Sequence, residues 1–225
     1  MIDPKDVTAC LVTRGNVDMQ RIIDTLPYGE VLIWDNSKED VDLAVFGRYE
    51  LTKRASNPVI YWQDDDVIFT EHEKLLEAYG YYGPNAYVAN NAHGPDPGGY
   101  EDLALQAAGA LCDLSVVADT WARWFQRYPN SHQRLRDPED QISCPPSPLS
   151  KKLRGDAARG TTAIFGECVL YEADFIFGVL CKRWAQIELP YQRLYAEDDT
   201  RLCRQPWQED LKFYATNLAR AIRDA

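Results

Sequence analysis

The sequence predicts an α/β domain in which helices cover both faces of a mostly parallel sheet. The first observation is that short apolar runs alternate with segments of helical periodicity through residues 1–91. The second is that polar residues follow these runs directly, as at Arg14 and at 35–37. Alternating strands and helices form parallel sheets, which bind ligands beyond the carboxyl ends of their strands. We therefore expect a ligand site where these polar residues follow strands.

Apolar runs predict the strands of residues 1–91, and helical spacing predicts the helices that connect them. The run at 58–63, PVIYWQ, is rich in β-branched and aromatic residues and is expected to be a buried strand. The expected strands are 7–13, 30–37, 42–47, 58–63 and 86–90. The expected helices are 17–26, 48–55 and 71–79.

Residues 92–225 contain longer irregular stretches. Residues 90–102 are rich in turn-forming residues and are expected to form a loop. Residues 129–160 are rich in proline and poor in large apolar residues, which predicts a long mobile loop or lid. Further expectations are helical character in the second half of 113–128, a strand then a helix over 161–184, and an amphipathic helix over 208–225.

The chain of 225 residues is 45% hydrophobic, which is enough for the core of one large domain. No apolar stretch reaches the roughly 18 residues of a membrane span, and the amino terminus carries acids where a signal peptide has basic residues. These features predict a cytoplasmic protein without a membrane partner. Six cysteines occur without a C-x-x-C pair, which favours reduced core thiols over a zinc site or a disulfide framework. The oligomeric state stays open.

The charge of the chain is unevenly distributed. The net charge is −11, so general attraction to nucleic acid is not expected. Residues 123–159 reverse this balance with eight Lys or Arg against four acids, so this window is +4 and the remainder −15. One interpretation is a solvated loop region with uneven charge, and the other is a surface for phosphate groups.

Three consecutive aspartates, 64–66, directly follow the expected buried strand at 58–63. Asp40 and Asp42 form the other Asp-x-Asp pair, but they precede an expected strand, where acids in a turn are ordinary. Adjacent carboxylates at the end of a buried strand repel one another unless a cation holds them. Mg²⁺ or Mn²⁺ binds one or two carboxylates together with ligand phosphates. We interpret 64–66 as a metal–diphosphate site, with a solvated loop as the alternative.

Four motifs together resemble those of a GT-A glycosyltransferase, in order and spacing over nearly the whole chain. They are CLVTRGN at 10–16, WDNS at 34–37, QDDDVIF at 63–69 and AEDDTRLCRQPW at 196–207. The first half is most similar to the exostosin-like branch, whereas AEDDTRL resembles family-2-type enzymes. Small bacteriophage-encoded glycosyltransferases are similar in layout and length. Because the first branch retains the anomeric configuration and the second inverts it, the stereochemistry stays open.

The resemblance implies one continuous GT-A-like, Rossmann-like domain with an acceptor-side lobe. Residues 1–91 are implied to bind a nucleoside-diphosphate sugar, with a UDP-sugar as the first expectation, and residues 92–225 the acceptor. The implied contacts to the nucleotide sugar are Thr13, Arg14, Asn16, Asp35, Asn36, Ser37, Arg48, Arg54, Asp64 and Asp65.

The resemblance also implies a metal site and a catalytic pair. Asp66 and Asp64 match the metal ligands, with Mn²⁺ or Mg²⁺ as the cofactor. Glu197 and Asp198 match the acceptor-side acidic pair, and Asp198 is the expected general base. The structural alternative for this pair is a helix amino terminus with favourable acids. Many GT-A enzymes add a late histidine, but all three histidines here precede residue 133, so metal binding is expected to depend on the nucleotide.

The first expectation for the acceptor is a 5-hydroxymethylpyrimidine in phage DNA. The +4 window offers cations for DNA phosphates while a base is flipped toward Asp198. The strong overall acidity argues the other way, so a virion protein, a glycan and a small molecule stay open as acceptors. The expected acceptor contacts are Trp121, Arg134, Arg136, Lys151, Lys152, Arg154 and Trp207, with core packing as the alternative for both tryptophans.

Other functions use a similar alternating sheet or bind nucleotides. An NAD-dependent enzyme requires a G-x-G-x-x-G turn and a P-loop kinase a G-K-[ST] sequence, and the chain has neither. Nucleotidylyltransferases share the alternating sheet and paired aspartates, but they usually begin with a Gly-rich loop that is absent here. A noncatalytic nucleotide-binding module is the alternative from a different class.

Overall fold

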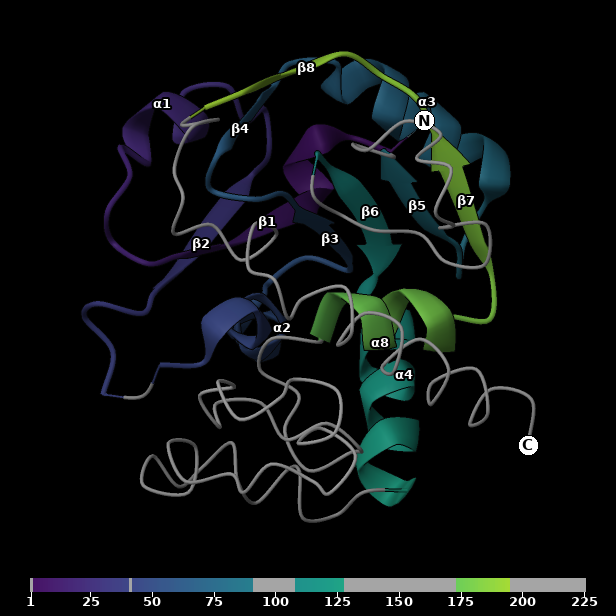
Figure 1. Ribbon diagram of the computed structural model, residues 1–225. Helices are drawn as coiled ribbons and strands as arrows, with labels where there is room; N and C mark the ends of the chain where they lie inside the picture. Colours follow the sequence, from purple (N-terminus) through teal and green to yellow (C-terminus); the bar gives the residue numbers. More distant parts are fainter. Residues whose placement is uncertain (1, 41, 91–107, 128–172, 195–225) are drawn as a thin grey trace, which may run out of the picture.

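The computed structural model describes residues 2–40, 42–90, 108–127 and 173–194 (Figure 1). This part forms a six-stranded sheet in the order β2-β1-β3-β6-β5-β7 and a two-stranded sheet of β4 and β8. The strands are β1 Val7–Thr13, β2 Glu30–Asp35, β3 Val59–Trp62, β4 Val67–Phe69, β5 Tyr87–Asn90, β6 Ala110–Asp113, β7 Trp184–Ile187 and β8 Tyr191–Arg193. The α-helices are α1 Gln20–Ile23, α2 Gly47–Leu51, α3 His72–Tyr82, α4 Leu114–Arg127 and α8 Ala173–Leu180. Short 3-10 turns are η1 Pro4–Asp6, η2 Ala44–Phe46 and η3 Thr52–Arg54.

Five strands of the large sheet run in one direction and β6 runs in the other. β1 is parallel to β2 and β3, and β5 is parallel to β7. β6 is antiparallel to both of its neighbours, β3 and β5. These pairings confirm the predicted α/β class with a mostly parallel sheet flanked by helices, the architecture expected of a GT-A-like domain.

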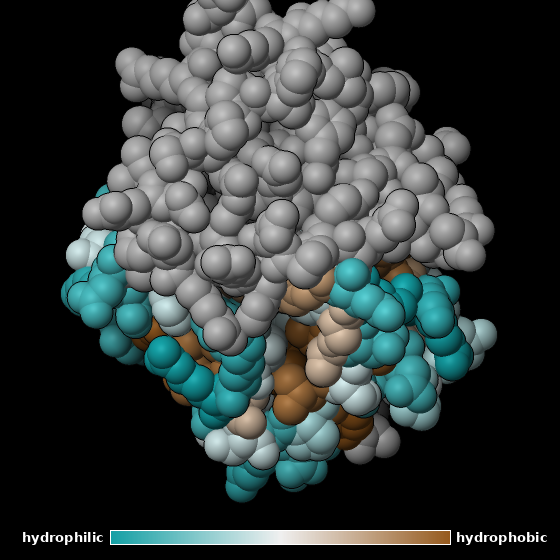
Figure 2. All heavy atoms as spheres, turned by 90° about the horizontal axis from the view of Figure 1, so that it is seen from below, coloured by the Kyte–Doolittle hydropathy of each residue, from teal (hydrophilic) through white to brown (hydrophobic). Residues whose placement is uncertain are grey.

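Side chains of the central strands alternate between two hydrophobic clusters, one on each face of the sheet. Ile60 and Trp62 of β3 pack with residues of α2, α4 and α8. Val59 and Tyr61 pack on the opposite face with residues of α3 and β4. Helices therefore cover both faces, as the sequence predicts. In the view of Figure 2, hydrophilic side chains cover much of the coloured surface, with hydrophobic ones exposed between them.

The carboxyl ends of three neighbouring strands meet at one edge of the sheet. Thr13 pairs with Asp35 at the ends of β1 and β2, and the amide of Asn36 donates to the carbonyl oxygen of Thr13 at 2.9 Å. β3 pairs with β1 in parallel through Tyr61 and Ala9, so the residues that follow β3 reach the same edge. The polar turns predicted to follow these strands therefore lie together.

The expected strand at 42–47 is wrong, because this segment forms η2 and the start of α2. Asn36 holds the segment in its turn: its Oδ1 accepts from the amide of Leu43 at 2.9 Å, and its Nδ2 donates to the carbonyl oxygen of Ala44 at 3.2 Å. Ala44 has a φ of 46°, which no strand residue adopts. Asn36 thus binds backbone groups of this segment that would pair with a neighbouring strand if the segment were a strand.

The carboxyl-terminal half differs further from the expectation. β6, β7 and β8 were not expected. α4 covers nearly all of residues 113–128, whereas only the second half of this stretch was expected to be helical. The expected helix within 161–184 is confirmed as α8. The predictions for 91–102, 129–160 and 208–225, and for a strand before residue 173, lie outside the described residues. Within the described ranges, no helix has the length and apolar character needed to cross a membrane.

Candidate active site

The three aspartates form the connection between β3 and β4, which we call the aspartate turn (Asp64–Asp66). Gln63 is buried beneath it and holds it at both ends. Its Nε2 donates to the carbonyl oxygen of Val67 at 2.8 Å, and its Oε1 accepts from the Tyr61 hydroxyl at 2.6 Å. Because both bonds are buried, Gln63 fixes the course of the chain through the turn.

Asp64 pairs with a buried arginine. The Nη2 of Arg48 in α2 donates to Asp64 Oδ1 at 2.8 Å, and the Arg48 side chain is only 2% exposed, against 31% for Asp64. Burial lowers the pKa of Arg48, but the carboxylates of Asp174 and Asp64 outweigh burial, so the net pKa is raised. Arg48 therefore stays cationic and directs its charge toward the aspartate turn.

A second carboxylate, from α8, shares the same guanidinium. Asp174 Oδ2 lies 3.8 Å from Arg48 Nη1, and its Oδ1 accepts from the Tyr49 hydroxyl at 2.9 Å. Burial raises the pKa of Asp174 to about 6, against the lowering by Arg48 and the Tyr49 hydrogen bond. The contact joins α2 to a helix that is 125 positions away in the sequence.

Asp66 is tied to β8. Its Oδ2 accepts from Arg193 Nη1 at 3.2 Å, and its carbonyl oxygen accepts from the amide of Leu194. Burial and then the neighbouring Asp64 raise the pKa of Asp66 to about 7, although Arg193 lowers it. Its carboxyl group is therefore partly protonated at neutral pH.

Asp65 faces the end of β1. Burial raises its pKa, a hydrogen bond with the Thr13 side chain lowers it, and the negative charge of Asp64 raises it again. Arg14, which is exposed, also lowers the pKa of Asp65, so its charge acts on the aspartate turn. The predicted donor residues Thr13 and Arg14 are therefore brought to the predicted metal site.

The turn after β2 packs directly against the turn after β1. Asp35 Oδ1 accepts from the amide of Ser37 at 3.0 Å and from its hydroxyl at 2.6 Å, while Lys38 binds the other carboxylate oxygen at 2.6 Å. The Lys38 and Ser37 bonds lower the pKa of Asp35. Gly15 has a φ of +80°, and a Cβ there would lie 2.1 Å from Ser37 Oγ. Only glycine fits where the two turns meet.

Three predicted site residues have contacts that hold the fold itself. Asn36 accepts from Trp34 Nε1 at 3.0 Å in addition to its bonds across residues 43 and 44. Arg54 is exposed and lies over the Trp34 ring, with 5.5 Å between its Cζ and the ring centroid. Trp121 is 6% exposed and belongs to the hydrophobic core beside α8.

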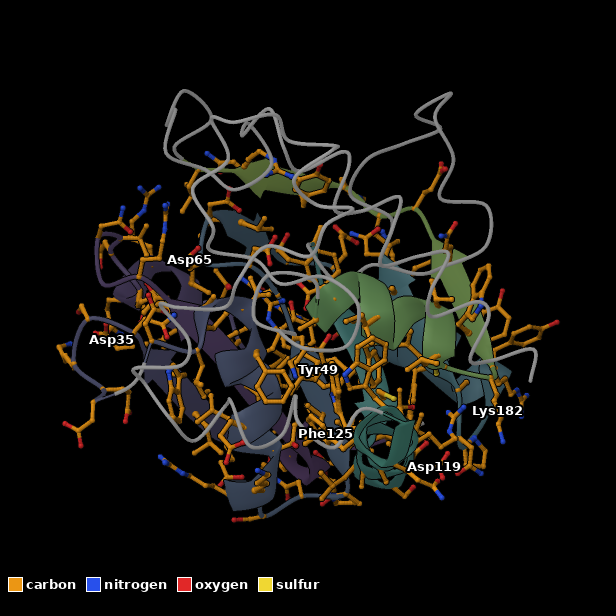
Figure 3. All side chains as sticks on the ribbon, turned by 60° about the horizontal axis from the view of Figure 1, so that its bottom comes forward. Asp35, Tyr49, Asp65, Asp119, Phe125 and Lys182 are labelled. Carbon is orange, nitrogen blue, oxygen red and sulfur yellow. The ribbon has the colours of Figure 1, made fainter. Side chains whose placement is uncertain are left out.

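The remaining predicted residues divide into described and undescribed ones. Asn16 is exposed, next to the junction of the first two turns. Figure 3 shows Asp35 and Asp65 on the same side of the molecule, with Asp119 of α4 on the other side. The predicted residues outside the described ranges are Arg134, Arg136, Lys151, Lys152, Arg154, Glu197, Asp198 and Trp207.

The aspartate turn has the donor chemistry of a hard divalent cation. Three carboxylates are consecutive, and the pKa values of Asp65 and Asp66 are raised by burial and by neighbouring negative charge, which a cation relieves. Among the described residues, no group of three or more His, Cys, Asp or Glu side chains is arranged to hold a metal ion. A cation held by one or two of these aspartates would take its other ligands from phosphates and water.

The sequence did not identify four residues that shape the turn. Arg193 pairs with Asp66 of the turn and Asp174 with Arg48 beneath it, both from distant parts of the chain, and nothing local distinguishes them. Gln63 carried a weak signal, because it is the one polar side chain that the expected buried strand at 58–63 includes, whereas nothing distinguished Tyr49 within the expected helix at 48–55. The contacts of the folded chain show their roles: Arg193 binds the turn, Gln63 binds the residue after it, Asp174 lies beside Arg48, and Tyr49 holds Asp174.

No protein-family model matches the chain, and no curated protein matches it. It is similar to a solved structure described as a glycosyltransferase involved in the glycosylation of the major capsid of PBCV-1. That similarity covers 81% of each chain at 12% identity, with a TM-score of 0.39. Values this low do not establish a shared family, activity or substrate.

Proposed function

We propose that the protein is a metal-dependent glycosyltransferase that moves a sugar from a nucleoside-diphosphate sugar, first of all a UDP-sugar, to a hydroxyl group. The observation that supports this most is the edge of the sheet where three polar turns meet. There, the aspartate turn lies beside Thr13 and Arg14, and the 35–37 turn packs against Gly15. A carboxylate turn for a metal–diphosphate next to polar turns for a nucleoside fits this class of donor.

In this proposal each part of the edge has a distinct task. The turns at 13–16 and 35–37 bind the base and ribose, while Asp66 and Asp64 hold Mn²⁺ or Mg²⁺. When bound, the cation supplies positive charge against the leaving diphosphate. Arg14 is exposed and adds a second positive charge at the same edge. Arg48 is buried under the turn and acts on the donor through Asp64.

Asp198 is proposed as the general base that removes the proton from the attacking hydroxyl, with Glu197 beside it. Leu194, the last described residue before them, donates its amide to Asp66. Asp198 is four residues further along, so covalent geometry keeps its Cα within about 15 Å of the Leu194 Cα. This short separation along the chain supports the assignment of Asp198 to this site.

For the acceptor we propose a 5-hydroxymethylpyrimidine in phage DNA, with the host cytoplasm as the place of action. The +4 balance of residues 123–159 supports a polyanionic acceptor. In that case, the contacts would come from Arg134, Arg136, Lys151, Lys152 and Arg154. A virion protein or a glycan would fit the net charge of −11 better, and the experiment below includes both.

The test is incubation of the protein with a panel of sugar nucleotides and Mn²⁺. The acceptors are hydroxymethylated DNA, unmodified DNA of the same sequence, a virion protein and a glycan, and mass spectrometry reads the products. We expect a hexose or pentose adduct on hydroxymethylated DNA, with release of the nucleoside diphosphate. Asp198→Asn should lower transfer at least roughly a hundredfold while leaving donor binding intact. Nucleotide binding without hydrolysis or transfer of any donor would favour a noncatalytic binding module.

A further inference from the structure

Arg48 is a buried cation with two anionic partners that come from different parts of the chain. Asp64 is 2.8 Å away, on the aspartate turn, and Asp174 is 3.8 Å away, in the first turn of α8. The Nε and Nη1 of Arg48 are buried, and neither has a hydrogen-bond partner among the residues that the structure describes. A buried charge is costly unless nearby charges compensate it, and both carboxylates contribute to the compensation of this guanidinium.

The position of Asp174 is fixed from the α2 side as well. The hydroxyl of Tyr49, the residue next to Arg48, donates to Asp174 Oδ1 at 2.9 Å. The Tyr49 ring packs against Trp62 and Phe177, with ring centroids 5.3 Å apart in each pair. Asp174 is therefore held beside the guanidinium by a hydrogen bond from a tyrosine whose ring is packed in the core.

Sharing the guanidinium has an electrostatic consequence for the aspartate turn. If Arg48 compensated Asp64 alone, the negative charge of Asp64 would be largely cancelled. Because Asp174 takes part of the interaction, the three groups together carry a net charge of about −1, and Asp64 keeps its attraction for a cation.

We infer that Asp174 is a positioning residue of the aspartate turn: it draws on the charge of Arg48, and so leaves Asp64 negative enough to bind a divalent cation. The inference rests on the proposed function, because it assigns that cation to Asp64. It follows that the site binds the cation fully only when α8 is packed against α2.

The test is the affinity of the full chain for Mn²⁺, from electron paramagnetic resonance of the free ion, together with KM and kcat for the donor. Asp174→Asn should weaken Mn²⁺ binding about fivefold or more and raise the donor KM similarly, with kcat changed less than about twofold. Asp174→Glu, which restores the charge, should recover most of the affinity. Asp119→Asn is the control, because Asp119 is 64% exposed on α4 and pairs with Arg123.

Tyr49→Phe keeps the ring and removes the bond that holds Asp174, so about a twofold loss in the same direction is expected, even if Asp174→Asn fails to fold. Unchanged Mn²⁺ affinity in both folded variants would overturn the inference alone. A large loss of kcat at constant KM in Asp174→Asn would also overturn it, because it would place Asp174 in the chemical step. A wild-type protein that binds no Mn²⁺, with or without nucleotide, would instead contradict the proposed function, and the inference with it.

Discussion

Arg48 donates to Asp64 across 2.8 Å, from a guanidinium that the hydrophobic core encloses. The pair joins α2, which packs on one face of the sheet, to the aspartate turn at its edge. In the proposed function, an arginine so deeply buried acts on the donor through Asp64.

Replacing Arg48 by methionine should lower the free energy of unfolding by about 3 kcal/mol, because Asp64 and Asp174 lose the cation that compensates them. Arg54→Met is the matched control. Arg54 is exposed and loses only its contact with the Trp34 ring, so a cost below about 1 kcal/mol is expected. Urea unfolding of both variants at pH 7 measures the difference. Equal costs would show that the buried pair adds nothing to stability.

Gly15→Ala should destabilise the fold by about 1–3 kcal/mol and weaken nucleotide binding. The glycine has a φ of +80°, and an added Cβ would lie 2.1 Å from Ser37 Oγ. Gly80→Ala is the control, since Gly80 lies in α3 with nothing within 4 Å of the added Cβ. That change should stabilise by about 0.5–1 kcal/mol, as usual for glycine in a helix. Thermal unfolding measures both variants: Tm should fall in Gly15→Ala and rise in Gly80→Ala. An unchanged Tm in Gly15→Ala would contradict the prediction.

Asp66 should make the folded protein less stable as pH rises. Its pKa is about 7 in the folded chain and 3.8 as the ordinary value, so the folded state binds the proton more tightly. Stability from this group is complete below about pH 4 and is lost as pH rises toward 7. Asp66→Asn does not titrate and should therefore gain on the order of 1–2 kcal/mol relative to wild type between pH 5 and pH 8, after allowance for solvent screening. A constant difference across this range would contradict the assignment.

His72 should have the opposite effect. Burial lowers its pKa from 6.5 to about 4, and its ring hydrogen-bonds with the Tyr28 hydroxyl at 3.0 Å. Because the unfolded state binds the proton more readily, the stability from neutral His72 is present above pH 6.5 and is lost as pH falls toward 4. The urea midpoint of His72→Gln should therefore vary less than that of wild type between pH 7 and pH 5. An identical pH dependence in both proteins would show that His72 does not titrate in this range.

The amino-terminal strands could be predicted because their signal is local. Apolar runs such as 7–13 and 58–63 end in polar residues, and β1 and β3 occupy those positions. The error at 42–47 has a cause that periodicity cannot reveal, since the Asn36 side chain binds the backbone amide of Leu43 and the carbonyl oxygen of Ala44. β7 and β8 are short and exist through pairing with β5 and β4, so a local pattern gives little sign of them.

The site residues, like the strands, could be predicted where the signal is local and not where it depends on distant contacts. The position of the aspartates after a strand pointed to the edge where three turns meet, and Thr13 and Arg14 do lie at that edge. Arg193 and Asp174 became visible only in the folded chain, because each acts on the turn from more than 100 positions away. A sequence shows which groups carry charge, whereas burial and pairing decide what that charge acts on.

The central claim is that the aspartate turn binds a metal–diphosphate, and isothermal titration of the protein with UDP, with and without Mn²⁺, tests it most directly. We expect Mn²⁺ to tighten UDP binding by roughly tenfold or more, since phosphates complete the coordination of the ion. Asp66→Asn should abolish this gain, and Asp119→Asn should retain it. Two results would contradict the account. One is that Mn²⁺ leaves the affinity for UDP, GDP and other nucleoside diphosphates unchanged. The other is that Mn²⁺ tightens UDP binding to Asp66→Asn as much as it does for the wild-type protein.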